Sequence, residues 1–265
     1  MFFELKNWKN KTNTREFSKE KKKVLEFTNQ NIGNENLKDF YFLHETSKLL
    51  NKEISRVVKL FPEFEDIVLV GTGGSSLGSK ALLMASCNSR ITFLENIDPI
   101  YVIERLKKLK KKKILLIIIS KSGETTEVLS LYKIITIYFN SMINFKSRAL
   151  VITEKQNSSL FRICEEEEIK FIEHNPNIGG RFSCFSITGL LPAKLAGLNS
   201  NYIKKLSNLT FKEIINNNKY SFVDNLASLL CLNKTNKYKG HTVLSYQKSL
   251  ISLMQWYRQL WGESL

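Results

Sequence analysis

The segment ILLIIIS, residues 114–120, constrains the fold more than any other feature, because Ile and Leu fill six consecutive positions before a polar turn. A short continuous apolar run rich in β-branched residues is typical of a strand buried on both faces, as in a parallel sheet. After Gly123 the period changes, and Val128, Leu131 and Ile135 recur at helical spacing. The residues between the two patterns therefore form a turn that joins a strand to a helix.

Hydroxyl side chains are concentrated in that turn, Ser120–Thr125, which we name the hydroxyl turn. A helix that begins near Thr125 directs unpaired backbone N–H groups and the positive end of its dipole toward one place. Hydroxyl donors beside them complete a pocket for an anion. A serine or threonine at a helix start is also a common capping residue, so the hydroxyls of one turn do not establish an anion site by themselves.

A second turn, GTGGSS at residues 71–76, also follows a strand pattern and opens a helix, and we name it the glycine turn. Its glycines allow close approach to the backbone, and Ser75 is the expected N-cap. The spacing is similar to a dinucleotide-binding fingerprint, with Glu95 or Asp98 near the position that would contact a ribose, and spacing alone leaves this alternative open. No G-K-[ST] follows the glycines, which argues against a P-loop.

Strand and helix patterns alternate from residue 64 onward, which predicts an α/β fold with a parallel sheet and ligands at the carboxyl ends of its strands. The predicted strands cover residues 66–71, 91–95, 114–120, 148–153 and 169–173. We expect three parts, which are a helical N-terminal arm over residues 1–60, the main α/β domain over 61–200, and a helical connector with the start of a second α/β unit over 201–265. In the last part GHTVLSY, residues 240–246, is predicted to be a strand that a helix follows.

The chain is basic, with a net charge of +15 and a pI near 9.6. The densest basic run, RLKKLKKKK at residues 105–113, follows a predicted helix and precedes a strand, as a solvated helix end does. No basic-aromatic motif accompanies it, so we expect no nucleic-acid partner and only an added attraction for a phosphorylated metabolite.

Neither a metal site nor a membrane span is expected. Ligand spacing is absent among the cysteines and histidines, which are Cys87, Cys164, Cys184, Cys231, His44, His174 and His241, so we predict no metal and no other cofactor. The longest apolar run is too short to span a bilayer, and the N-terminus lacks the pattern of a secretory leader. We therefore expect a cytoplasmic protein.

Four motifs taken together resemble a known family. GTGGSSLGSKAL (71–82) and SKSGETTEVL (120–129) are similar to the two sugar-phosphate-binding turns of the sugar isomerase (SIS) domain. NIGGRFS (177–183) and QLWGES (259–264) resemble the G-G-R-[FY]-S and Q-x-x-x-E-S segments of the phosphoglucose isomerase family. The resemblance implies a doubly wound, three-layer α/β/α SIS domain. It also implies interconversion of glucose 6-phosphate and fructose 6-phosphate through an enediolate, in glycolysis and gluconeogenesis.

The resemblance assigns a role to each residue of the expected site. It makes Glu263 the base that moves the proton and Arg181 the cation beside the enediolate. Gln259, one helical turn before Glu263, is expected to contact the sugar. The residues expected at the phosphate are Ser75, Ser120, Ser122 and Thr125 through their hydroxyls, Lys121 through its backbone or charge, and Gly74 through close approach.

Two consequences of the resemblance concern the whole protein. The family pattern continues past E-S into a G-K segment and most of a second SIS domain with a ring-opening histidine and a lysine, whereas this sequence stops at Leu265. We therefore expect a shortened product that binds hexose phosphates, forms homodimers as the family does, and turns its substrate over poorly. The alternative is a non-catalytic SIS-type sugar-phosphate sensor, which would not need Arg181, Gln259 or Glu263. Acceptance of mannose 6-phosphate is left open.

Overall fold

The computed structural model describes residues 14–31, 47–61, 63–86, 90–109, 113–139, 145–216, 227 and 242–264. The chain divides into two compact units, one of residues 1–44 and 205–244 and one of residues 45–204 and 245–265. Helix α2 (Arg15–Asn31) belongs to the first unit, and α11 (Ser200–Asn216) crosses the boundary between the two. All residues of the expected site lie in the second unit. The three-part division expected from the sequence stays a prediction.

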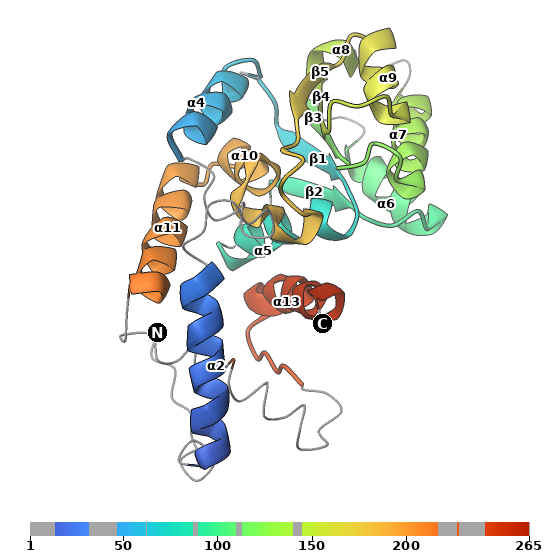
Figure 1. Ribbon diagram of the computed structural model, residues 1–265. Helices are drawn as coiled ribbons and strands as arrows, with labels where there is room; N and C mark the ends of the chain where they lie inside the picture. The colour runs from blue at the N-terminus through green and yellow to red at the C-terminus, as the bar shows by residue number, and fades with distance from the viewer. Residues whose placement is uncertain are drawn as a thin grey trace. The chain divides into compact units, whose positions relative to one another are not determined.

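The second unit is built on a parallel sheet of five strands in the order β2-β1-β3-β4-β5 (Figure 1). The strands are β1 (Asp66–Val70), β2 (Ile91–Leu94), β3 (Ile114–Ile119), β4 (Ala149–Thr153) and β5 (Lys170–Glu173). Each strand expected from the sequence is therefore present, and every pairing is parallel. Strand β3 lies in the centre with all its side chains buried, as its unbroken apolar run predicts.

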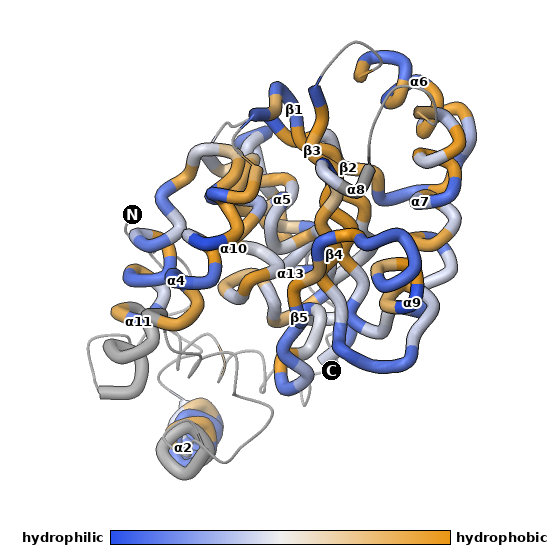
Figure 2. Tube along the Cα trace, turned by 90° about the horizontal axis from the view of Figure 1, so that it is seen from above, coloured by the Kyte–Doolittle hydropathy of each residue, from blue (hydrophilic) through white to orange (hydrophobic). Residues whose placement is uncertain are grey.

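Helices cover both faces of this sheet. Alternate strand residues such as Leu69 and Ile117 pack with α4 (Ser47–Val58), α5 (Leu77–Ala85) and α10 (Ile187–Leu195). The intervening residues, such as Val68 and Ile118, pack with α6 (Pro99–Leu109), α7 (Thr126–Phe139) and α9 (Ser159–Glu166). Figure 2 shows the apolar strands β3 and β4 enclosed by helices that turn polar residues outward. The expected doubly wound, three-layer α/β/α arrangement is confirmed.

Further helices belong to the second unit. These are the 3-10 helices η2 (Gly73–Ser75), η3 (Gly180–Phe185) and η5 (Lys248–Leu250) and the α-helices α8 (Phe145–Arg148) and α13 (Ile251–Ser264). The expected strand over residues 240–246 is wrong for the part that the structure describes, because residues 242–247 have no regular secondary structure. A strand needs a neighbour to accept its hydrogen bonds, and Leu244 and Tyr246 are 74% and 99% exposed instead of packed.

Several expectations fall outside the described residues. They are those for His44, His241, Cys87, Cys231 and the middle of the basic run, residues 110–112. No helix in the described part of the chain combines the length and the apolar character that crossing a bilayer requires.

Candidate active site

The glycine turn and the hydroxyl turn leave neighbouring strands at one edge of the sheet. Strands β1 and β3 are paired with Val70 opposite Ile118, so the residues that follow each strand begin side by side. A Cβ atom placed on Gly71 would lie 3.3 Å from the carbonyl oxygen of Ile119. Both turns therefore lie at the same carboxyl edge of the sheet.

The hydroxyl turn is organised by its own side chains. Ser120 is buried, and its Oγ lies 2.9 Å from Thr125 Oγ1 and accepts a hydrogen bond from the Gly123 N–H at 3.2 Å. Ser122 Oγ accepts the Glu124 N–H at 3.2 Å. A hydroxyl that accepts a backbone bond keeps its own proton to donate. Accepting a backbone bond therefore does not prevent Ser122 from donating to an anion, whereas one proton of the Ser120 and Thr125 pair is already donated within the turn.

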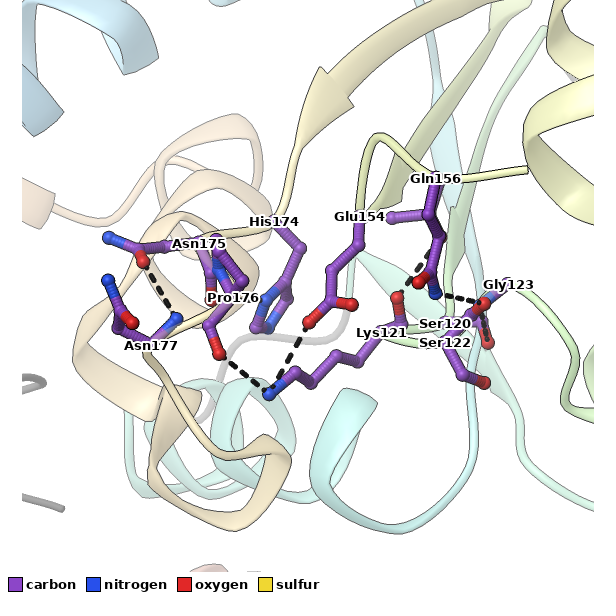
Figure 3. Close-up of polar contacts among 11 residues, drawn as sticks. Ser120, Lys121, Ser122, Gly123, Glu154, Gln156, His174, Asn175, Pro176 and Asn177 are labelled. Atoms are coloured by element: carbon purple, nitrogen blue, oxygen red, sulfur yellow. Dashed lines mark hydrogen bonds and ion pairs between the residues drawn. The ribbon is translucent and has the colours of Figure 1, made fainter. Parts of the chain in front are cut away.

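The side chain of Lys121 is directed to the neighbouring loops. Its Nζ donates to the carbonyl oxygen of Pro176 at 3.0 Å and lies 3.4 Å from Glu154 Oε1 (Figure 3). Of the two roles expected for Lys121, a contribution through the backbone fits this geometry better, because the ammonium group is already paired.

The glycine turn differs by one residue from the expectation. A 3-10 helix, η2, occupies Gly73–Ser75, so the N-cap of α5 is Ser76 instead of Ser75. The Ser76 hydroxyl is buried and donates to Glu95 Oε1 at 2.7 Å, and Lys80 pairs with the same carboxylate. Glu95 is thus paired within the protein, which argues against it as the ribose contact of a dinucleotide site and leaves only Asp98 of the two expected carboxylates.

Close backbone contact joins the glycine turn to η3, which carries Arg181. A Cβ atom on Gly74 would lie 2.3 Å from the carbonyl carbon of Gly180 and 2.6 Å from the Arg181 nitrogen. The Ser183 hydroxyl donates to the Gly74 carbonyl oxygen at 3.1 Å. This contact holds Arg181 beside the glycine turn, and the close approach of a phosphate to Gly74 stays a prediction.

Helix α13 brings the remaining expected residues to Arg181. Trp256 Nε1 donates to the Arg181 carbonyl oxygen at 2.9 Å, and Arg181 Nε donates to Ser264 Oγ at 3.1 Å. One guanidinium nitrogen of Arg181 lies 3.9 Å from Glu263 Oε2. Gln259 Nε2 donates to the other carboxylate oxygen of Glu263 at 3.0 Å. A carboxylate, a guanidinium group and an amide are thus assembled from segments that are distant in the sequence.

Gln259 connects this group to the glycine turn. Its Nε2 lies 3.1 Å from the position that a Cβ atom on Gly73 would take, and Gly73 has a φ of +54°. The Gln259 Oε1 atom is buried and accepts no hydrogen bond from the described residues. A buried acceptor without a donor costs free energy. The side chain of Glu263 remains 52% exposed and therefore open to a ligand.

The sequence did not reveal the residues that support this site. Three residues hold Arg181 or the backbone of η3 in place, and they are Trp256, Ser183 and Ser264. All three lie in or beside the two phosphoglucose isomerase motifs, and this position is the one sequence signal that could have identified them. His174 is 2% exposed, and its Nδ1–H donates to the Asn175 carbonyl oxygen at 2.9 Å. Burial lowers the pKa of His174 below its usual range.

Cys184 follows Arg181 and Ser183 in η3, beside the glycine turn. Burial raises the pKa of the Cys184 thiol to about 12, which suppresses the reactive thiolate. Among the residues that the structure describes, His, Cys, Asp and Glu do not gather in groups of three or more that could hold a metal ion.

Among the curated proteins similar to this chain are glucose-6-phosphate isomerases. A glucose-6-phosphate isomerase of Campylobacter jejuni is 32% identical over 232 residues, which cover 85% of this chain and 56% of that protein. A probable glucose-6-phosphate isomerase of Methanococcus maripaludis is 31% identical over 264 residues, which cover 94% of this chain and 56% of that protein. The chain therefore spans about half the length of the curated relatives it matches.

Solved structures share the fold. A hypothetical protein from Thermus thermophilus has a TM-score of 0.76 at 26% identity, over 94% of this chain and 60% of that one. A glucose-6-phosphate isomerase from Chlamydia trachomatis has a TM-score of 0.70 at 20% identity, over 92% and 54%. The family model described as phosphoglucose isomerase matches residues 45–265, a range that includes both turns, η3 and α13. Sequence, site geometry and fold therefore agree that the chain belongs to the phosphoglucose isomerase family.

Proposed function

We propose that this chain binds hexose 6-phosphates and carries the base and the cation for interconversion of glucose 6-phosphate and fructose 6-phosphate. The observation that supports this most directly is the meeting of Glu263, Gln259 and Arg181 beside the glycine turn. Aldose–ketose isomerisation needs a carboxylate base near a fixed cation, and it needs the far end of the sugar to be held. The hydroxyl turn, on the adjacent strand, supplies that second requirement.

The phosphate is held in this proposal by the two turns. Helices α5 and α7 begin directly after them, so both helix dipoles favour an anion at this edge of the sheet. The hydroxyl groups that would donate to the phosphate oxygens are those of Ser75, Ser120, Ser122 and Thr125. Hydrogen bonds to a charged oxygen are stronger than those between neutral groups, so the phosphate dominates the affinity.

Proton transfer in this proposal uses Glu263 and Arg181. Glu263 accepts the C2 proton of the open-chain aldose, the electron pair of that C–H bond forms the C1–C2 double bond, and the carbonyl oxygen at C1 takes the negative charge. Arg181 stabilises that oxygen, since its guanidinium group is permanently charged and offers several donors. The proton of the C2 hydroxyl then moves to the O1 oxygen, the C2–O bond becomes a carbonyl, and the electron pair of the C1–C2 double bond takes the proton back from Glu263 at C1, which gives the ketose.

Gln259 has two functions in this proposal. Its Nε2–H group holds one oxygen of Glu263, which fixes the direction of the carboxylate. Its Oε1, which has no donor among the described residues, accepts a hydrogen bond from a sugar hydroxyl once the side chain moves to expose it.

Hydrogen exchange at the reacting carbon tests the role of Glu263. Fructose 6-phosphate is incubated with the chain in heavy water, and loss of the C1 proton signal is followed by NMR. We expect deuterium to accumulate over hours with the unaltered chain, because abstraction from the open-chain ketose requires only base and cation. Glu263→Gln removes the base and should abolish exchange, whereas Glu166→Gln, an exposed change on α9, should leave it intact.

Binding without exchange would support the second class of function. If the unaltered chain binds fructose 6-phosphate but leaves its C1 protons in place, a non-catalytic sugar-phosphate sensor is the better description. Equal binding of fructose and fructose 6-phosphate would contradict both functions, because neither turn would then recognise a phosphate.

We also propose that the protein acts as a homodimer in the cytoplasm. The support for self-association is the exposure of two large apolar side chains of the second unit, Tyr246 and Ile251. Sedimentation at micromolar concentration should give twice the mass of 30.7 kDa, and a monomer would contradict the proposal.

A further inference from the structure

Residues 153–160, which connect β4 to α9, hydrogen-bond to the backbone of the hydroxyl turn. We name them the bracing segment, because they donate to three successive carbonyl groups of that turn. The Lys121 carbonyl oxygen accepts the Glu154 N–H at 3.0 Å, and the Ser122 carbonyl oxygen accepts Gln156 Nε2 at 2.8 Å. The Gly123 carbonyl oxygen accepts the Leu160 N–H at 3.0 Å. Figure 3 shows Gln156 extended toward Ser122.

These bonds determine where the opposite side of each peptide group points. All described peptide bonds are trans, and a trans peptide places its N–H group and its carbonyl oxygen on opposite sides. The N–H groups of Ser122, Gly123 and Glu124 are therefore turned away from the bracing segment. Those of Gly123 and Glu124 donate to the Ser120 and Ser122 hydroxyl oxygens. The Ser122 hydroxyl keeps its proton to donate, and one proton of the hydrogen-bonded Ser120 and Thr125 pair remains.

A carboxylate from the hydroxyl turn completes the attachment. Glu124 Oε1 accepts the Ser159 N–H at 2.6 Å and Glu124 Oε2 accepts the Ser159 hydroxyl at 2.9 Å, at the N-terminus of α9. Hydrogen bonds from Ser159 lower the pKa of Glu124, so this carboxylate stays ionised at neutral pH. A negative charge at a helix N-terminus is favourable. Glu124 is thus an anion held beside a turn that itself is suited to binding an anion.

The bracing segment also excludes a side chain from the middle of the hydroxyl turn. Gly123 has a φ of +69°, and a Cβ atom there would lie 2.1 Å from Ser158 Oγ and 3.0 Å from Thr153 Oγ1. Ser158 Oγ in turn caps α9 by accepting the Phe161 N–H at 3.3 Å. The hydroxyl turn and the start of α9 therefore pack directly on each other, so a shift of one would displace the other.

We propose that Glu124 and Gln156 are positioning residues that hold the hydroxyl turn in the orientation needed to bind the phosphate group of a hexose 6-phosphate. The inference rests on the proposed function and adds to it residues that touch no substrate. Lys121 extends the same attachment to the loop after β5 through Pro176. A turn held from behind by its carbonyl groups presents its hydroxyl donors without reorganisation, which favours binding of the phosphate.

Whether substitution of Glu124 weakens or strengthens phosphate binding distinguishes a positioning role from a purely electrostatic one. Removal of the negative charge of Glu124 should strengthen anion binding if only charge matters. Positioning predicts the opposite for Glu124→Ala, which loses both bonds to Ser159. Glu124→Gln keeps an acceptor for the Ser159 N–H and should recover much of the affinity. Gln156→Ala, which alters an exposed and neutral side chain, should weaken binding without any change of charge.

Calorimetric titration with fructose 6-phosphate and with inorganic phosphate tests this, at a temperature where circular dichroism shows each variant to be folded. We expect Glu124→Ala to weaken both ligands about tenfold, the lower end of what outer contacts contribute at metal sites. Gln156→Ala should show a smaller loss, and Glu166→Gln on α9 should bind as the unaltered chain does. A purely structural role would lower the melting temperature and leave both dissociation constants unchanged.

Each remaining outcome has a definite meaning. Unaltered or tighter binding in both Glu124→Ala and Gln156→Ala overturns the inference and leaves the proposed function standing. If Glu124→Ala does not fold, Gln156→Ala decides alone. An unaltered chain that binds neither ligand overturns the proposed function, and the inference with it.

Discussion

The hydroxyl turn and the glycine turn leave adjacent strands at the same edge of the sheet, but they are held in different ways. The hydroxyl turn is attached through hydrogen bonds, with successive carbonyl groups accepting donors from the bracing segment. The glycine turn is attached through direct packing, because the backbone of Gly74 lies against that of Gly180 and Arg181. The two halves of one candidate site therefore depend on different interactions.

This difference predicts different tolerance to substitution. Hydrogen bonds to the backbone fix the direction of polar groups and leave room for side chains at most positions of the turn. Packing of two backbones excludes even a methyl group at the point of contact. Single changes in each turn should therefore separate the two means of attachment.

Gly74→Ala should have the largest effect on stability. The added Cβ atom would meet backbone atoms of η3 at 2.3–2.6 Å, and backbone cannot move aside as a flexible side chain can. We expect the free energy of unfolding to fall by about 3 kcal/mol, as for strong overpacking, in urea denaturation. Gly180→Ala is the matched control, since its Cβ atom would meet only Gly74 Cα at 4.0 Å. Equal losses in the two variants would contradict the packing argument.

Gly123→Ala should have a smaller effect. A positive φ costs an alanine about 1–2 kcal/mol, and displacement of the Ser158 hydroxyl weakens the cap of α9. We expect a loss of about 2 kcal/mol from the same denaturation measurement. Gly197→Ala separates the two causes, because Gly197 has a φ of +96° and no atom within 4 Å of the added Cβ. A loss at Gly123 no greater than that at Gly197 would show that the contact with Ser158 contributes nothing.

Acidification should change the free energy of unfolding least of the three perturbations. The group that we expect to respond is His174, which lies near Lys121 and Glu154 beside the hydroxyl turn. Because burial lowers the pKa of His174 in the folded state, the unfolded chain takes up a proton first as the pH falls through the ordinary value of 6.5. The contribution of this group is therefore complete above pH 6.5 and is lost progressively below it. His174→Asn, which keeps an N–H donor near the Nδ1 position, should flatten the decline of unfolding free energy between about pH 7 and about pH 5.5. An unchanged slope would assign the pH dependence to other groups.

The fold was largely predictable from local patterns. Strands β1 to β5 were expected within a few residues of their bounds, because buried parallel strands are short apolar runs separated by helical periods. Residues 242–247 carry a similar pattern but form no strand, since pairing depends on a neighbour that the pattern does not report. The N-cap was misplaced from Ser76 to Ser75 because two successive serines do not reveal the 3-10 helix that precedes α5.

The candidate site was predictable only in part. The motifs identified Arg181, Gln259 and Glu263, and the structure brings these residues together. Motif matching did not indicate that Lys121 pairs with Glu154, or that Trp256 holds the Arg181 carbonyl oxygen. These contacts join residues separated by tens of positions, and no local propensity records them.

The amino-acid sequence by itself determined that a buried parallel sheet forms and that turns rich in glycine and hydroxyl groups follow two of its strands. Burial of apolar side chains and the spacing of helical positions are local enough to be read along the chain. Only the tertiary structure decided which carbonyl groups of the hydroxyl turn are taken by the bracing segment and how closely Gly74 approaches Gly180. The physical reason is that hydrogen bonds and backbone contacts between distant segments exist only after the order and register of the strands are set.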